Sequence, residues 1–180
     1  MTIEPDRAAT DTAALAGTHL LAIDTAGASC GVALVALEAA RSAEPVAHAI
    51  TLGIGHAARL LGLVDEMLGL AGLDPAQVGA IAYGAGPGSF TGLRIGCGVA
   101  LGWALARGCP VFAIDSLQAL AWASAQAAAL PAGAVVAAVR DARMQQAYAA
   151  AWTWQGAGTP MLPLVQPFVA APDEVAERLG

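Results

Sequence analysis

Short apolar runs and longer periodic apolar stretches follow one another along the chain in a regular order. The short runs, bounded by turn residues, predict strands at His19–Asp24, Cys30–Leu37, Val46–Leu52, Ala80–Tyr83 and Val111–Ile114. The longer stretches predict helices from about His56 to Leu70, from about Gly92 to Gly108, and from Asp115 or Ser116 to about Ala129. This βββαβαβα order predicts an α/β fold with a mixed sheet, in which a three-strand meander is followed by parallel crossovers.

The same order begins again after Pro131. Strands are predicted at Ala134–Arg140, Gln146–Thr153 and Leu162–Phe168, and Pro172-Asp173 opens a helix. The repeat is one of element order, without a match at the level of residues. We therefore expect a loose tail over residues 1–17, an N-terminal lobe over residues 18–130, and the start of a second, incomplete lobe over residues 131–180.

The predicted helix that follows the glycine-dense turn is apolar or small on every side. Arg94 and Arg107 are its only charges, and Gly92, Gly96 and Ala100 form one row of residues four positions apart. A helix that is apolar all round has to be covered all round. Each glycine costs about 1 kcal/mol relative to alanine in a helix. We therefore expect another part of the protein to pack very close to this helix backbone.

The helix predicted from His56 to Leu70 carries a wide apolar surface. Its apolar side chains spread over roughly 180° of the circumference, whereas one neighbouring element needs a stripe of about 100°. Arg59, Asp65 and Glu66 occupy the remainder. Two neighbouring helices with surplus apolar surface predict a docking face of the helix-bundle kind. The alternative is that another segment of the same chain covers them, and the pattern leaves both interpretations open.

Charge and composition narrow the classes of function. The chain has 14 acidic and 8 basic residues, for a net charge of −6, and every basic residue is an arginine. An unaided nucleic-acid-binding protein normally carries a basic stripe, which this chain lacks. The absence of lysine excludes Schiff-base chemistry and the P-loop lysine. Three cysteines without a close pair indicate reduced thiols and a cytoplasmic location, and no stretch is predicted to span a membrane.

Two turns are candidates for contact with phosphate. Asp24-Thr25-Ala26-Gly27 resembles the phosphate-loop position of the actin-like ATPase superfamily, which makes Asp24, Thr25 and Gly27 candidates for a weak ATP or ADP contact. An Asx-type turn capped by its own carboxylate accounts for these residues equally well. The glycine turn lacks the Walker lysine and has Ser89 in place of the third glycine of GxGxxG, so a turn that permits close backbone approach is favoured there.

Metal and nucleophile sites find less support. His56 begins a helix where a metalloenzyme would need a second ligand one turn later, and that position is Leu60. His19 and His48 have no evident partner, and no serine lies in a G-x-S-x-G motif. Three function classes follow: a non-catalytic partner subunit, an ATP-dependent ATPase or phosphotransferase that uses Asp24 and the glycine turn, and, with least support, a metallopeptidase.

Four segments of the chain closely resemble the TsaB (YeaZ) family, the dimerisation subunits of the bacterial tRNA threonylcarbamoyladenosine machinery. These segments are Leu21–Thr25, His56–Leu68, Gly86–Gly96 and Asp141–Met144, and the glycine–serine–phenylalanine–threonine run is the most specific. The resemblance extends from about Leu20 to Tyr148. It implies a two-lobed actin-like (Hsp70-like, RNase H-like) fold, in agreement with the predicted order of elements. Members of the family usually continue for several tens of residues more, so the second lobe is short here.

The resemblance further implies a non-catalytic subunit that requires no cofactor. Such proteins pair with the catalytic paralogue TsaD through the first two helices of each partner. With the ATPase TsaE they support threonylcarbamoyl transfer to N6 of adenosine 37 in tRNA, and they reach the tRNA only through the complex. A homodimer through the same face is the alternative assembly. The implied interface residues are Leu60, Val64, Met67, Gly92, Gly96, Val99 and Trp103.

Overall fold

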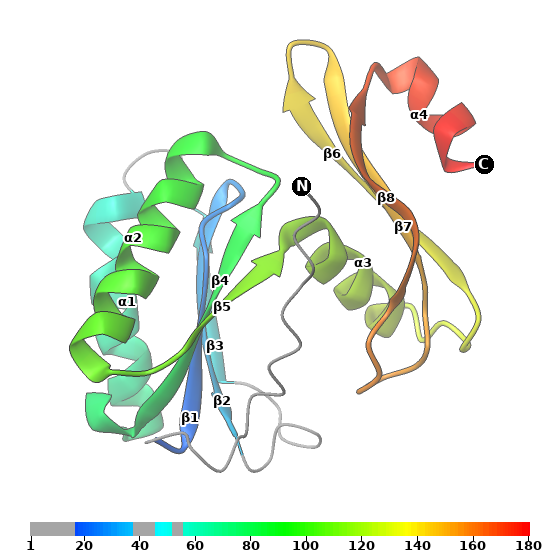
Figure 1. The fold of residues 1–180 in the computed structure, drawn as a ribbon. Coiled ribbons are helices and arrows are strands. Elements are labelled where there is room, and N and C mark those ends of the chain that lie inside the picture. Colours follow the sequence, from blue (N-terminus) through cyan, green and yellow to red (C-terminus); the bar gives the residue numbers. More distant parts are fainter. Residues whose placement is uncertain (1–16, 38–45, 52–55) are drawn as a thin grey trace.

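The computed structural model describes residues 17–37, 46–51 and 56–180, which form two lobes, each built on one β-sheet (Figure 1). The elements of the first lobe are β1 (His19–Asp24), β2 (Ser29–Ala36), β3 (Val46–Thr51), α1 (His56–Ala71), a 3₁₀ turn η2 (Pro75–Gln77), β4 (Val78–Gly86), α2 (Phe90–Arg107), β5 (Val111–Asp115) and α3 (Ser116–Ala127). The βββαβαβα order predicted from the sequence is therefore confirmed. All but the last residue of the predicted tail lies outside the described residues.

The first sheet has the strand order β3-β2-β1-β4-β5. β1, β2 and β3 form an antiparallel meander, while β4 pairs in parallel with both β1 and β5. The crossovers between the parallel strands pass through α1 and α2, which lie side by side on one face of the sheet (Figure 1). The mixed sheet agrees with the predicted meander followed by crossovers.

β4 is longer than the sequence predicts. The glycine-dense segment is predicted to leave the sheet after Tyr83, but the strand continues to Gly86 and keeps its pairing with β5, with an irregularity between Gly84 and Gly86. A Cβ atom at Gly84 would collide with the carboxylate of Asp24 and press on the hydroxyl of Ser116. Glycine at this position therefore allows a polar strand end to pack against the sheet, which extends β4 instead of ending it.

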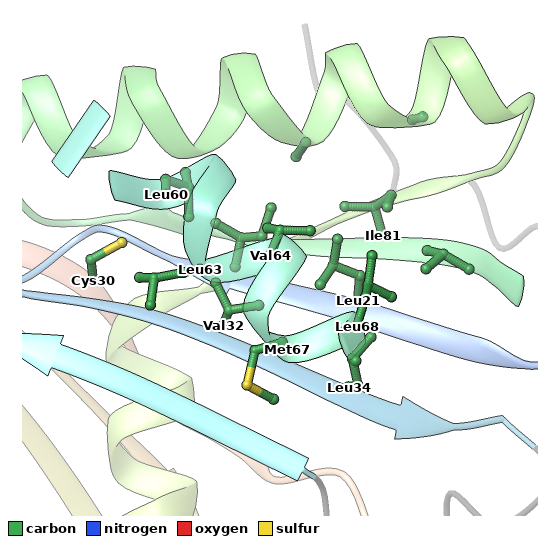
Figure 2. Packing of buried hydrophobic residues seen from close by; sticks show 14 residues of the cluster. Leu21, Cys30, Val32, Leu34, Leu60, Leu63, Val64, Met67, Leu68 and Ile81 are labelled. Carbon is green, nitrogen blue, oxygen red and sulfur yellow. The ribbon is translucent and has the colours of Figure 1, made fainter. Parts of the chain in front are cut away.

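The core of the first lobe lies between this sheet and the two helices α1 and α2 (Figure 2). The inward side of α1 packs on residues that alternate along β1 and β2, as the two-residue period of a strand requires. The largest fully buried side chains in this core are Leu21, Leu60, Leu63, Val64, Met67, Ile81 and Val78. The apolar positions that recur along β1, β2 and α1 therefore all face this one core.

The second lobe repeats the first four elements. β6 (Val135–Arg143), β7 (Gln146–Thr153) and β8 (Leu162–Ala170) form an antiparallel sheet in the order β6-β7-β8, followed by α4 (Pro172–Leu179). α3 buries Leu117, Ala121 and Ala125 in a cluster with Trp152 of β7 and Trp154, the residue after that strand ends. The predicted domain boundary at residue 130 stays a prediction. The buried side of α3, which precedes that boundary, packs into the core of the second lobe.

Among the helices of the described segments, none has the length and hydropathy that a membrane crossing requires.

Candidate functional site

The inward side of α2 lies directly against the turn between β1 and β2. The Thr25 side chain is buried, and its Oγ1 donates a hydrogen bond of 2.7 Å to the carbonyl oxygen of Gly92. A Cβ atom at Gly92 would collide with the Thr25 carbonyl oxygen, and one at Gly96 would collide with Thr25 Oγ1. The prediction that another element packs against this helix backbone is confirmed at these two positions.

This packing corrects the predicted interface. Leu60, Val64 and Met67 are fully buried in the core of their own lobe, and Gly92 and Gly96 are buried against Thr25. A partner cannot contact side chains that the chain's own sheet already covers. Five of the seven predicted interface residues therefore lie on the wrong side of their helices. The other two, Val99 and Trp103, are half-buried and pack at the edge of the same core.

The opposite side of the two helices is exposed and carries several leucines and glycines, together with Asp65 and Glu66 of α1. Leu61 and Leu70 of α1 are 52% and 73% exposed, and Leu101 and Leu105 of α2 are 53% and 88% exposed. Glycines lie between these leucines, and a Cβ atom added to any of them would meet no heavy atom within 4 Å among the described residues. We call this surface the outward face; it consists of Leu61, Gly62, Gly69, Leu70, Gly98, Leu101, Gly102 and Leu105.

The outward face carries charge on α1 and near the ends of α2. On α1, Asp65 and Glu66 are exposed between Leu61 and Leu70. Arg94 and Arg107 stand near the two ends of α2, and the exposed residues between them carry no charge. Arg94 is stacked over the Phe90 ring, with the guanidinium carbon 3.7 Å from the ring centroid. The sequence contained a signal for this surface, because Gly98 and Gly102 form a second row of small residues beside the buried one. Periodicity alone did not indicate which of the two rows is covered.

A shallow hollow of about 360 Å³ adjoins the outward face near the start of α2. It is lined by Tyr83, Ala85, Leu93, Arg94, Cys97 and Gly98. The hydrogen bond between the side chains of Tyr83 and Cys97, together with burial, raises the pKa of the Tyr83 hydroxyl. The remaining lining residues, Ala85, Leu93 and Gly98, are small or apolar, and Arg94 brings a charge to the hollow.

A larger cavity of about 680 Å³ lies on the other face of the first sheet, beside α3. Its floor is made of small residues of the sheet, and its polar side chains are those of Asp24, Tyr83, Ser116 and Arg140. Asp24 Oδ1 accepts a hydrogen bond of 2.8 Å from the Ala26 amide, which is the geometry of the predicted Asx-type turn. That interpretation of the turn is confirmed.

The three residues predicted to contact a nucleotide differ in how accessible they are in the structure. Thr25 is only 1% exposed and its hydroxyl already donates to α2, so the Thr25 side chain is not free for a nucleotide contact. Asp24 is exposed and lines the large cavity. Gly27 lies beside Arg140, whose Nη2 would be 3.0 Å from an added Cβ atom. For Asp24 and Gly27 a weak ATP or ADP contact stays a prediction.

The position that a second metal ligand would need is part of the core. Leu60 of α1 is fully buried in the core of the first lobe. It lies one helical turn after His56, whose side chain is outside the described residues. Within the part of the chain that the structure describes, no group of three or more histidine, cysteine or acidic residues lies close enough together to hold a metal ion. All three cysteines are free thiols, and burial raises the pKa of Cys30 and Cys109.

Two comparisons of the sequence with known proteins agree with this architecture. Residues 52–173 match the family described as TsaD, tRNA N6-adenosine threonylcarbamoyltransferase. The tRNA threonylcarbamoyladenosine biosynthesis protein TsaB of Haemophilus influenzae is 41% identical over 129 residues, which are 72% of this chain and 51% of that protein. The Escherichia coli TsaB is 39% identical over 131 residues, which are 72% of this chain and 53% of that protein. The chain therefore spans about half the length of the curated relatives it matches.

The solved structures give the same result at the level of the fold. A Pseudomonas aeruginosa protein, described as similar to the peptidase YeaZ, superposes with a TM-score of 0.77 and is 36% identical. That superposition covers 88% of this chain and 68% of the P. aeruginosa chain. A second structure of YeaZ from the same organism superposes with a TM-score of 0.75. Sequence identity, element order and superposition all agree that the chain belongs to the TsaB/YeaZ family of actin-like proteins.

Proposed function

We propose that this chain is a non-catalytic partner subunit that pairs with a TsaD-type threonylcarbamoyltransferase and supports the modification of adenosine 37 in tRNA. Membership of the TsaB/YeaZ family supports the pathway, since relatives from two organisms are named for threonylcarbamoyladenosine biosynthesis. A TsaE-type ATPase is the second proposed partner, and tRNA is contacted only through the complex. The protein acts in the cytoplasm and requires no cofactor of its own.

The observation that carries the proposal is the outward face of α1 and α2. Four exposed leucines surround glycines that have open space above them, so another helix could approach the backbone closely. Burying such leucines against a partner contributes about 25 cal/mol for each Å² of apolar surface removed from water. The partner is a TsaD-type protein because its matching domain would present equivalent helices. A second copy of this chain would use the same face.

A catalytic role is less well supported than the partner role. The family that matches residues 52–173 is named for an enzyme, but Leu60 replaces the second imidazole that a two-histidine metal site needs. Leu60 is also fully buried in the core, so this position serves packing. The ATPase or phosphotransferase alternative is favoured by no specific observation, since Thr25 is committed to α2 and Asp24 to its own turn.

The test is a charged substitution in the outward face with a matched control. Leu101→Glu places a carboxylate in the middle of the face, while Leu164→Glu does the same at an equally exposed leucine of β8, the exposed fractions being 53% and 56%. Light scattering after gel filtration should give a heterodimer with the TsaD-type paralogue for the native chain and for Leu164→Glu. Leu101→Glu should remain unpaired while its circular dichroism stays native. Undiminished pairing by Leu101→Glu would count against the proposal.

A further inference from the structure

Arg140 reaches across from the second lobe to the first. It lies on β6, and its guanidinium donates two hydrogen bonds to backbone carbonyl oxygens of the first lobe. Nη2 lies 2.6 Å from the Ala26 oxygen, and Nη1 lies 3.2 Å from the Pro87 oxygen. Two separate acceptors suit the planar fork of an arginine, which directs several N–H groups along fixed and different directions.

The two acceptors belong to two different turns that meet at this point. Ala26 lies in the turn between β1 and β2, and Pro87 lies in the glycine turn between β4 and α2. The Ala26 oxygen also accepts a 2.8 Å hydrogen bond from the Ser89 amide. Gly88 permits this approach, because a Cβ atom there would collide with the Ala26 carbonyl oxygen. One guanidinium therefore holds together two turns that are about sixty residues apart.

Both turns also hold the first turn of α2. Ser89 caps the helix, since its Oγ accepts a 3.2 Å hydrogen bond from the Gly92 amide. From the other turn, Thr25 Oγ1 donates to the Gly92 carbonyl oxygen at 2.7 Å in a buried position. The contacts thus form a continuous series from Arg140 in the second lobe to the start of α2.

We infer that Arg140 is a positioning residue, which fixes the second lobe against both turns and thereby fixes the first turn of α2 in the orientation that a partner meets. The inference has two parts. The first, that Arg140 orders the turns, is independent of any partner. The second, that this order is required for docking on the outward face, rests on the proposed function. Rotation of the second lobe away from the first would break both hydrogen bonds and free the N-terminal end of α2.

The chain offers close controls for this inference. Arg143 lies three residues further along β6 and has the same charge, but its side chain is 88% exposed and forms an ion pair of 3.6 Å with Asp141. Arg143→Ala therefore removes an equal charge from the same strand without touching the first lobe. Arg140→Lys keeps the charge but loses the fork. Gly27→Ala keeps the arginine and presses a methyl group against its Nη2, which is 3.0 Å away.

Hydrogen–deuterium exchange read by mass spectrometry tests the first part. In Arg140→Ala, the amides of residues 86–92 should exchange about tenfold faster than in the native chain, because the Ser89 amide loses its fixed acceptor. Arg140→Lys and Gly27→Ala should show smaller increases in the same segment, and they serve in place of Arg140→Ala if that variant does not fold. Arg143→Ala should exchange at the native rate. Native exchange over residues 86–92 in all three Arg140 and Gly27 variants would overturn the inference.

Titration of the same variants with the TsaD-type paralogue tests the second part. Arg140→Ala should lower the affinity about tenfold although Arg140 is not part of the outward face, and Arg143→Ala should leave it unchanged. Faster exchange together with native affinity would overturn the link to docking and leave the ordering of the turns intact. If Leu101→Glu also pairs normally, the proposed function fails, whereas the exchange result still decides the role of Arg140.

Discussion

The inward and outward sides of the α1–α2 layer both carry glycines and leucines, but in different surroundings. On the inward side, Gly92 and Gly96 are required because Thr25 occupies the space that a side chain would need. On the outward side, Gly98 and Gly102 have no heavy atom within 4 Å of an added Cβ in the segments that the structure describes. The first pair of glycines satisfies the fold of this chain. The second pair costs helix stability and gains no contact with the described segments, which agrees with a surface made for another molecule.

The difference also separates two kinds of apolar side chain. Leu60 and Leu61 are neighbours on α1, but one is fully buried in the core and the other is 52% exposed. Burial by the chain's own sheet makes Leu60 a determinant of stability. Exposure makes Leu61 available to a partner at no cost to the fold. Substitutions that treat the two sides alike should therefore produce opposite results on stability and on pairing.

The largest expected effect is at Leu60. Leu60→Ala should lower the free energy of unfolding by about 4 kcal/mol, because it removes buried methyl groups and leaves a cavity in the core of Figure 2. Leu61→Ala should change it by less than about 1 kcal/mol. Urea unfolding followed by circular dichroism measures both values. Equal losses at the two positions would mean that the inward and outward sides are not distinguished as the structure shows.

The next effect is at Gly92. Gly92→Ala should destabilise the fold by about 3 kcal/mol, because the new methyl group collides with the Thr25 backbone carbonyl, which cannot move without displacing β1. Gly102→Ala makes the same chemical change on the outward side, where the structure leaves room. Thermal unfolding of the two variants side by side is the measurement. A Gly92→Ala chain as stable as the native one would show that α2 does not approach the turn this closely.

A smaller loss is expected at Thr25. Thr25→Val keeps the shape of the side chain and removes the hydroxyl that donates to Gly92, which should cost about 1.5 kcal/mol. Thr25→Ser retains the hydroxyl and should recover part of the difference. Denaturant unfolding of the two variants separates the hydrogen bond from the packing. If serine gives no recovery, the stability at this turn comes from the methyl group alone.

The sequence predicted the order of the elements because apolar periodicity is a local property of the chain. It also predicted that something packs against the backbone of α2, since several glycines in one helix need a reason. It did not predict which side of α2 is covered, because the turn that carries Thr25 lies 67 residues away along the chain. Arg140 was missed for the same reason, although it is the first charged residue after the apolar start of β6. Contacts between distant segments decide these assignments.

The smallest expected effect is a gain in stability that carries a loss of function. Gly98→Ala should make the isolated chain more stable by about 0.8 kcal/mol, because alanine favours a helix and its methyl group meets open space. The same methyl group stands where a partner helix would approach the backbone, so pairing with the TsaD-type protein should weaken by severalfold while the melting temperature rises. Unfolding and affinity titration measured on one preparation decide the matter. A variant that gains stability and pairs as well as the native chain would show that the outward glycines are not held for close approach, and the partner would then contact the leucines alone.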